Sequence, residues 1–292
     1  MLDCLLAAAL WAISLSLYRR PIVESGALAV NLFKCAAAAS GYWLFILLVG
    51  RGIGPGGVRE YVSLAVSGIV GFTLGDYMLF VSVREGGVQR ALVLFNTSPL
   101  IATLLAIPVL GEMPLSSTWA GIGLVLVGVW LVESDPVRVA AARESPPRRH
   151  PWLATLAGLG AAAGQALGIL FSRGPLQTVP VLPATATRLT AAVVTLAPLL
   201  AIAQGRQGYR NLGPTRWPRL LAPVLLGTVI ALLFSMRGIR DVPAGVSSSL
   251  LATTPLFALP IARFALKEPI GRRSVLGTFV AVAGVFLLSH WN

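Results

Sequence analysis

Long apolar stretches separated by short charged segments recur throughout this chain of 292 residues and decide what it can fold into. A helix rises about 1.5 Å per residue, so about 20 apolar residues are needed to cross a hydrocarbon layer roughly 30 Å thick. Hydrophobic residues make up 56% of the chain and charged residues only 12%, which excludes a water-soluble globular domain. Lipid offers no partner to an unpaired backbone amide, so the spans have to be helical. The sequence therefore predicts an all-α integral membrane protein.

Ten apolar runs bounded by charged residues, glycine and proline predict ten transmembrane helices. They cover residues 2–18, 27–49, 61–83, 88–110, 118–132, 152–171, 183–203, 217–237, 244–266 and 274–288. The first run begins almost at Met1, so either this helix is short or the natural chain starts upstream. Glycines recur every fourth residue in the third and sixth runs, a spacing that favours close helix packing.

The spans divide five and five around residues 133–150, a polar segment with three prolines and four arginines. At a constant offset of 156 residues, residues of the first half match residues of the second. The pairs include Gly71 and Gly227, Thr97 and Thr253, Pro99 and Pro255, Glu112 and Glu268, Gly121 and Gly277, and Gly128 and Gly284. We therefore predict a first five-helix repeat at residues 1–132, a linker loop at 133–150 and a second five-helix repeat at 151–292. An odd number of spans per repeat gives the two repeats inverted topology, with a substrate site near the midplane where they meet.

The formal net charge of +12 is spread over many loops and forms no continuous basic stripe with interleaved aromatic residues. This pattern predicts contact with anionic lipid headgroups and argues against nucleic acid as a partner. The side of the membrane that holds the termini has few basic residues beyond Arg51, Arg59, Arg173, Arg237 and Arg240. The positive-inside rule therefore predicts that both termini lie outside the cell.

Recurrent short motifs resemble the EamA unit of the drug/metabolite transporter superfamily. They are Ser98-Pro99, Leu110-Gly111-Glu112, Gly121 and Gly128 in the first half, Thr254-Pro255, Glu268, Gly277 and Gly284 in the second, and Trp11 in the first span. The resemblance covers essentially the whole chain. Met113, Lys267 and Pro269 depart from the usual residues around the two glutamates.

This resemblance implies a secondary transporter of the cell membrane, in bacteria the inner membrane, that exports amino acids or similar small metabolites by alternating access. It places the first and sixth helices at a central cavity, which nominates Trp11 and Gln165 for substrate binding. It also implies cytoplasmic termini, in conflict with the charge rule. The small-molecule substrate and membrane lipids would be the partners, with a proton as a candidate coupling ion.

Charged side chains inside apolar runs are the strongest candidates for function, because insertion of a charge costs roughly 2.5–3.5 kcal/mol. Asp76 lies well inside the third run, with Leu232 at its repeat-equivalent position. It predicts either a carboxylate that binds a proton or an amine, or one held by a nearby basic residue. Lys34 and Arg188 lie near the starts of comparable helices. They predict either side chains that reach the headgroups or an anion-binding site.

Matched prolines in the fourth and ninth runs predict a helix kink at Pro99 and at Pro255. A proline removes one backbone donor, so the carbonyls of Phe95 and Leu251 need other partners. Short polar side chains surround both prolines and are predicted to bind substrate. They are Asn96, Thr97, Ser98, Thr253 and Thr254.

Aromatic and polar residues in other spans complete the predicted substrate site, although packing is the alternative for each. They are Tyr77, Phe95, Phe234 and Ser248. His150 and His290 lie at span boundaries, and no metalloprotease helix or phosphate loop is present in the sequence. We predict no cofactor, no metal and no catalysis. A lipid-modifying membrane enzyme and a non-transporting structural or regulatory protein are the alternatives.

Overall fold

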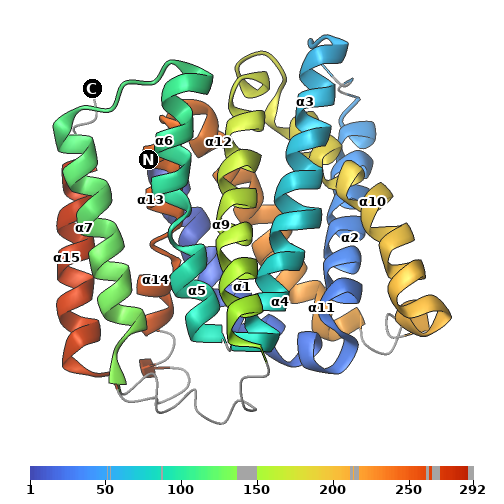
Figure 1. Cartoon of the computed structure of the whole chain (residues 1–292). Helices are drawn as coiled ribbons and strands as arrows, with labels where there is room; N and C mark the ends of the chain where they lie inside the picture. The colour runs from blue at the N-terminus through green and yellow to red at the C-terminus, as the bar shows by residue number, and fades with distance from the viewer. Residues whose placement is uncertain are drawn as a thin grey trace.

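The computed structural model describes residues 1–50, 52, 54–86, 88–136, 150–210, 213, 217–260, 263–264 and 270–288. Regular structure in this part of the chain is entirely helical (Figure 1). The first half contains α1 (Leu2–Ser25), α2 (Ala27–Leu48), α3 (Val58–Gly68), η1 (Ile69–Gly75), α4 (Asp76–Gly86), α5 (Val88–Phe95), α6 (Ser98–Leu110) and α7 (Ser116–Glu133). The second half contains α9 (Pro151–Arg173), η3 (Pro175–Gln177), α10 (Val181–Arg210), α11 (Trp217–Pro223), η5 (Val224–Ile230), α12 (Ala231–Asp241), α13 (Ala244–Leu251), α14 (Thr254–Pro260) and α15 (Arg272–Leu288).

Seven helical stretches in the described residues are long and apolar enough to cross a membrane. Three predicted spans do not meet this requirement. The first is sufficiently apolar only over Leu2–Ser14, the ninth is divided into α13 and α14, and the tenth, α15, has 17 residues. The all-helical architecture is confirmed, whereas the number of ten spans stays a prediction. Large apolar side chains also face outward: Phe279 and Phe286 in α15 are 71% and 69% exposed, as expected where lipid surrounds the helix.

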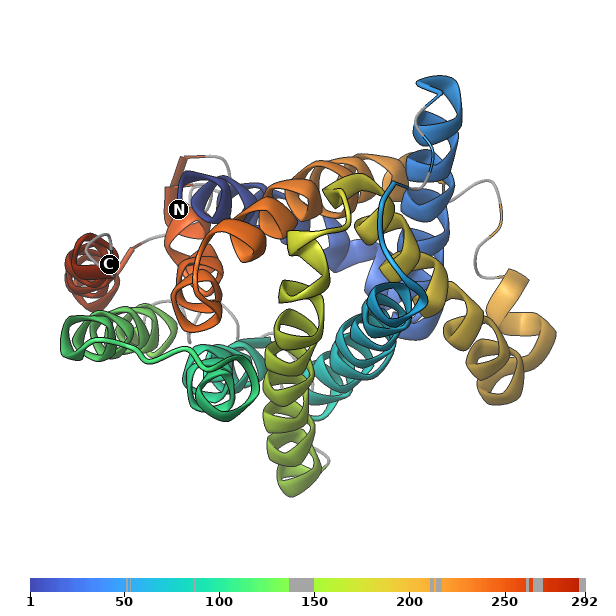
Figure 2. The same cartoon turned by 90° about the horizontal axis from the view of Figure 1, so that it is seen from above.

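The first helix of each half packs mainly against helices of the other half. Helix α1 contacts η5, α12 and α14, and α9 contacts η1, α4 and α6 (Figures 1 and 2). Two further pairs join the halves, α2 with α10 and α7 with α15. The buried core therefore lies along the boundary between the halves. The two cysteines, Cys4 and Cys35, are buried in it as free thiols.

The predicted third and eighth spans each contain a π-helical segment, η1 between α3 and α4 and η5 between α11 and α12. Glycines let η1 approach α9 closely. A side chain on Gly164 would meet the backbone of Gly75 at 2.9 Å, and one on Gly168 would meet that of Gly71 at 3.2 Å. The glycine spacing seen in the sequence therefore serves packing between the halves.

Helices α7 and α15 pack backbone to backbone through the glycines of the repeated motif. A Cβ on Gly128 would lie 2.5 Å from the carbonyl oxygen of Gly277 and 2.5 Å from the amide nitrogen of Ala281. On the neighbouring turns, a Cβ on Gly284 would lie 2.8 Å from the carbonyl oxygen of Gly121. No side chain fits at Gly128 or Gly284, so the motif fixes the separation of the two helices.

We predict that Gly128→Val destabilises the protein, because overpacking of a tight contact costs about 1–3 kcal/mol. Thermal unfolding of the purified protein in detergent measures the effect. Gly123→Val is the matched control, since Gly123 is in the same helix and nothing lies within 4 Å of the added Cβ. Equal melting temperatures for the two variants would contradict the packing role of the motif.

Candidate functional site

Lys34 in α2 forms an ion pair with Asp76, the first residue of α4. The Nζ atom donates to Oδ2, and the side chains are 15% and 19% exposed. The structure thus brings together two residues that the sequence places 42 positions apart. In this state of the protein the carboxylate of Asp76 is held by a basic residue, Lys34, which is one of the two interpretations from the sequence. A role in substrate or proton binding stays a prediction.

Phe72 in η1 lies within reach of both intramembrane cations. Its ring centroid is 6.0 Å from Nζ of Lys34 and 5.0 Å from Cζ of Arg188, distances at which cations interact with an aromatic face. The backbone oxygen of Phe72 accepts a hydrogen bond of 2.9 Å from Nδ2 of Asn31 in α2. We call Lys34, Phe72, Asp76 and Arg188 the charged cluster.

Arg188 in α10 is buried, with only 4% of its surface exposed. Its Nη1 donates to Sδ of Met236 in α12, and its Nε has no hydrogen-bond partner. Glycines lie beside the guanidinium: a Cβ on Gly71 or Gly168 would be 3.5 or 3.6 Å from Nη2. The interpretation in which Arg188 reaches the headgroups is wrong, because packing of α10, η1, α9 and α12 encloses the side chain.

The matched prolines divide their spans into separate helices, which corrects the predicted kinks. Helix α5 ends at Phe95 and α6 begins at Ser98, while α13 ends at Leu251 and α14 begins at Thr254. A proline fits the first turn of a helix, where its missing amide costs nothing. Pro99 and Pro255 each occupy the second position of the new helix.

Threonine hydroxyls satisfy backbone carbonyls at these two breaks. Thr97 Oγ1 donates to Leu94 O at 2.7 Å, and Thr253 Oγ1 donates to Leu250 O at 2.6 Å. The carbonyl of Leu251, freed by proline, accepts from Thr254 Oγ1 at 2.8 Å. Asn96, Ser98 and Thr253 are buried within the protein, and the Nδ2 of Asn96 has no partner. The hydroxyl bonds of Thr97, Thr253 and Thr254 are therefore local, and Asn96 keeps an unused donor.

The remaining predicted site residues are distributed over several helices. Trp11 Nε1 donates to the oxygen of Gly227 in η5 at 2.8 Å. Ser248 is buried with an unpartnered hydroxyl, and Phe234 contacts the guanidinium of Arg237 at 5.9 Å. Tyr77 is 45% exposed.

Two others take partly buried positions. Phe95 ends α5, and the backbone of Gln165 lies 3.6 Å from where a Cβ of Gly75 would be. Within the described part of the chain, no recorded interaction joins the charged cluster to Asn96 or Thr253.

A second polar arrangement, which sequence reasoning missed, lies at the end of the bundle that holds the chain termini. Gly111 ends α6 with a φ of 67°, a left-handed conformation that favours glycine, and Glu112 follows it at the start of α13. One carboxylate oxygen of Glu112 accepts a hydrogen bond from Nε of Arg173, the last residue of α9, and the two side chains form an ion pair. The other accepts the amide of Ala244 at 2.8 Å, at the start of α13.

Arg173 also donates to backbone carbonyls at the end of α12, to Ile239 O at 2.7 Å and to Val242 O. We call Glu112, Arg173, Ile239, Val242 and Ala244 the termini-side network. It joins α6 of the first half to three helices of the second. The sequence signal was an acidic residue directly after a helix-ending glycine, which is suited to cap another helix.

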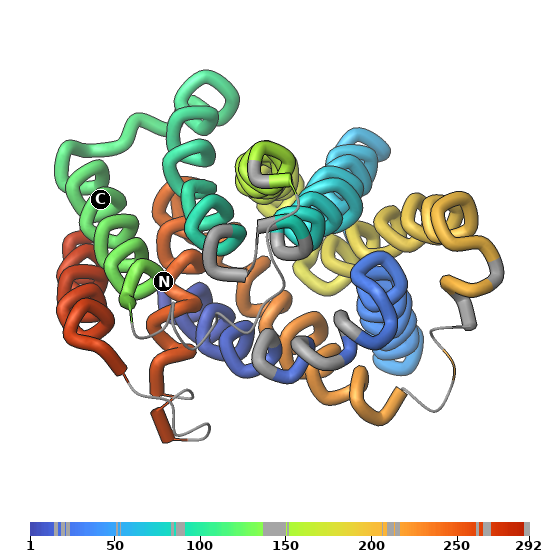
Figure 3. The backbone as a smooth tube through the Cα atoms, turned by 60° about the horizontal axis from the view of Figure 1, so that its bottom comes forward, coloured from blue at the N-terminus to red at the C-terminus, as the bar shows by residue number. Residues whose placement is uncertain are grey.

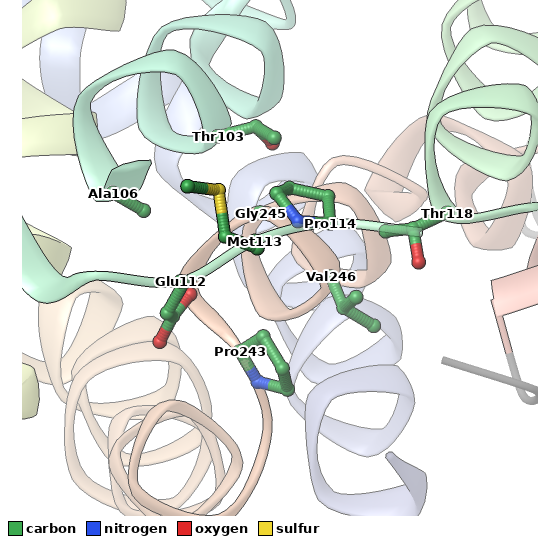
Figure 4. A pocket seen from close by; sticks show the side chains of 9 residues that line it. All are labelled: Thr103, Ala106, Glu112, Met113, Pro114, Thr118, Pro243, Gly245 and Val246. Carbon is green, nitrogen blue, oxygen red and sulfur yellow. The ribbon is translucent and has the colours of Figure 1, made fainter. Parts of the chain in front are cut away.

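A pocket of about 190 Å³ adjoins this network (Figure 4). Its nine described lining residues are Thr103, Ala106, Glu112, Met113, Pro114, Thr118, Pro243, Gly245 and Val246, and they include none of the predicted substrate-binding residues. Behind it α6 and α13 meet closely, since a Cβ on Gly245 would lie 2.9 Å from Cβ of Thr103.

Comparisons with known proteins agree with this architecture. A family model described as the EamA-like transporter family matches residues 1–134 and 152–290. Two proteins of Bacillus subtilis (strain 168) are similar. The uncharacterized transporter YwfM is 28% identical over 215 residues, which is 73% of this chain and 68% of that protein. The uncharacterized transporter YetK is 22% identical over 229 residues, 78% of this chain and 68% of that one.

A solved crystal structure has the same fold, with a TM-score of 0.75. It is 17% identical, and the match covers 98% of this chain and 94% of that chain. At this identity the likeness concerns the fold alone. The overall helix arrangement of Figure 1 therefore has an experimental counterpart.

Proposed function

Because the chain belongs to the EamA-like transporter family, we propose that it is a secondary transporter that exports amino acids or similarly small polar metabolites. It is a multi-pass protein of the cell membrane. Its family and its transporter relatives point to transport and not to catalysis. The observation that carries the proposal is the charged cluster, because charges are retained among apolar helices where they serve a solute or ion pathway.

Ten spans in two inverted repeats, residues 1–132 and 151–292 with a linker at 133–150, are the architecture that we propose. Several features of the packing support it. The exchanged contacts of α1 and α9 correspond to one another, as do the π-helical segments η1 and η5 and the broken spans α5–α6 and α13–α14. Such repeats place a solute site where they meet, and rocking of one against the other exposes it to each side in turn.

The broken spans differ between the two ends of the bundle, and this difference supports alternating access. Towards the termini, α6 packs on α13 and the termini-side network links them. In the described part of the chain α5 and α14, which correspond to them at the opposite end, make at most a marginal contact (Figure 3). We propose that the protein is here closed towards its termini, and that the opposite state closes α5 onto α14.

Within this mechanism, Asp76 would bind the amine of the solute or a coupling proton. Asn96, in the break between α5 and α6, and Ser248, in α13, have unused donors, and we propose that both contact the solute directly. Trp11, Tyr77, Phe95, Gln165 and Phe234 would shape the pathway, while the hydroxyls of Thr97, Thr253 and Thr254 keep the breaks intact.

Solute flux tests the function directly. Purified protein in liposomes is loaded with a panel of unlabelled amino acids, amines and small carboxylates, and counterflow of each labelled solute is measured. We expect saturable uptake of at least one amino acid that empty liposomes lack. Absence of saturable flux for the whole panel, with protein that unfolds cooperatively on heating, would rule out the proposal.

A further inference from the structure

Resting on the proposed transport function, we propose that the solute carries a carboxylate or an equally small anionic group and that Arg188 binds it. The inference concerns the guanidinium at the meeting point of α10, η1, α9 and α12. It names a binding residue and a chemical class of substrate that the fold alone leaves open.

The first step is the missing counter-charge of Arg188. A buried ion is retained when a partner of opposite charge and further hydrogen bonds replace its water. Arg188 has neither in full: the described residues place no carboxylate within ion-pair distance, and its Nε has no acceptor. Its Nη1 meets only the thioether of Met236, which is a weak acceptor. The guanidinium therefore has capacity for an anion that the protein does not supply.

The second step is a comparison of the two halves. Lys34 and Arg188 lie at the same depth in their helices, seven residues after Ala27 and seven after Val181. The two helices run in opposite directions (Figure 1). Lys34 is neutralised by Asp76, but the position that corresponds to Asp76 holds the buried Leu232. The charged cluster thus has two cations and one carboxylate, a net charge of +1.

The third step is the shape of the site. A guanidinium offers parallel donors that fit the two oxygens of a carboxylate. Gly71 and Gly168 place no side chain against Nη2. The ring centroid of Phe72 lies 5.0 Å from Cζ of the guanidinium. Met236 is unbranched and flexible, so a solute can displace it during opening. About 10 Å of helix separates Arg188 from the start of α10, at a rise of about 1.5 Å per residue, which puts the site inside the membrane.

Binding in lipid nanodiscs tests the inference without requiring transport. Thermal stabilisation is titrated with acids and their neutral amides: L-alanine and L-alaninamide, L-phenylalanine and L-phenylalaninamide, lactate and lactamide, benzoate and benzamide. We expect at least one acid to bind about tenfold more tightly than its amide. Arg188→Gln should remove this preference, and Arg188→Lys should restore part of it. Arg219→Gln, at an exposed ion pair, is the control and should keep it.

A second pair of variants tests the site even if Arg188→Gln does not fold. Met236→Glu supplies a carboxylate beside Nη1, whereas Met236→Gln supplies a neutral side chain of the same length. The glutamate should raise the melting temperature of the empty protein and abolish the acid preference, because it occupies the anion site. The glutamine should do neither.

The outcomes separate the two proposals. Acid preference that depends on Arg188, together with no flux of any solute, would remove the transport function and keep the site. Saturable flux with equal affinity for acids and amides in the wild-type protein would keep the function and overturn the site. Acid preference that survives in both Arg188→Gln and Met236→Glu would also overturn it.

Discussion

Asp76→Asn is expected to abolish most transport, at least about tenfold in rate, and to destabilise the protein by about 3 kcal/mol. The variant removes the carboxylate that pairs with Lys34 and leaves an ammonium that is only 15% exposed. Breaking a buried pair on one side is costly because the remaining charge keeps its desolvation penalty. Counterflow in liposomes measures the rate, and thermal unfolding in the same lipid measures the stability.

A double variant separates the structural and functional roles of this pair. Lys34→Met with Asp76→Leu removes both charges and fills the space with apolar side chains, an exchange that is often neutral or stabilising. Recovery of stability with transport still lost would show that transport needs the charges of the pair and not only their contribution to stability. Recovery of both would reduce the pair to a structural element and remove Asp76 from the proposed site.

The all-helical membrane architecture follows from the sequence, because hydropathy and span length act locally. The repeated glycines of the EamA motif are informative for a related reason. A Cβ on Gly128 would lie 2.5 Å from the backbone oxygen of Gly277, so only glycine permits this contact. The motif therefore predicts that these two helices pack together. Seven spans meet the length and hydropathy requirement, and one of them, Ala91–Leu110, does so although it contains the break between α5 and α6.

The candidate site is harder to predict, because it depends on which helices meet. Charge and depth alone left two interpretations for Asp76 and two for Arg188. The packing of α2 against α10, with η1 between the cations, brings Lys34 to Asp76 and leaves Arg188 facing a thioether. A basic side chain near a helix start reaches the surface only where no neighbouring helix covers it. Whether a helix covers it depends on the tertiary structure and not on the local sequence. The breaks next to Pro99 and Pro255 differ, because the hydroxyls of Thr97 and Thr254 bond carbonyls only three residues before them, those of Leu94 and Leu251.

Glu112→Ala is expected to shift the protein out of the state that is closed towards the termini. The glutamate holds Arg173 and caps α13 through the amide of Ala244, so its loss weakens the junction of α6 with α13. Loss of one charge-assisted bond and one helix cap costs about 2–3 kcal/mol. Because about 1.4 kcal/mol corresponds to a factor of ten, the open population should rise by more than tenfold.

Thiol labelling reports this shift. Thr103 is 1% exposed and lines the pocket beside Glu112, so Thr103→Cys in a background of Cys4→Ala and Cys35→Ala should react slowly with a membrane-impermeant reagent. Adding Glu112→Ala should accelerate labelling about tenfold, since separation of α6 from α13 uncovers this position.

Glu24→Ala is the matched control, because it removes a carboxylate from an exposed ion pair with Arg219, whose side chains are 42% and 67% exposed. An exposed pair contributes little, so labelling should keep its slow rate. A tenfold rise in both variants would indicate general loosening of the bundle. A rise confined to Glu112→Ala would assign closure of this end to the termini-side network, because Glu112 bonds both Arg173 and the first residue of α13. Unchanged labelling in Glu112→Ala would mean that helix packing holds this end shut without the ion pair.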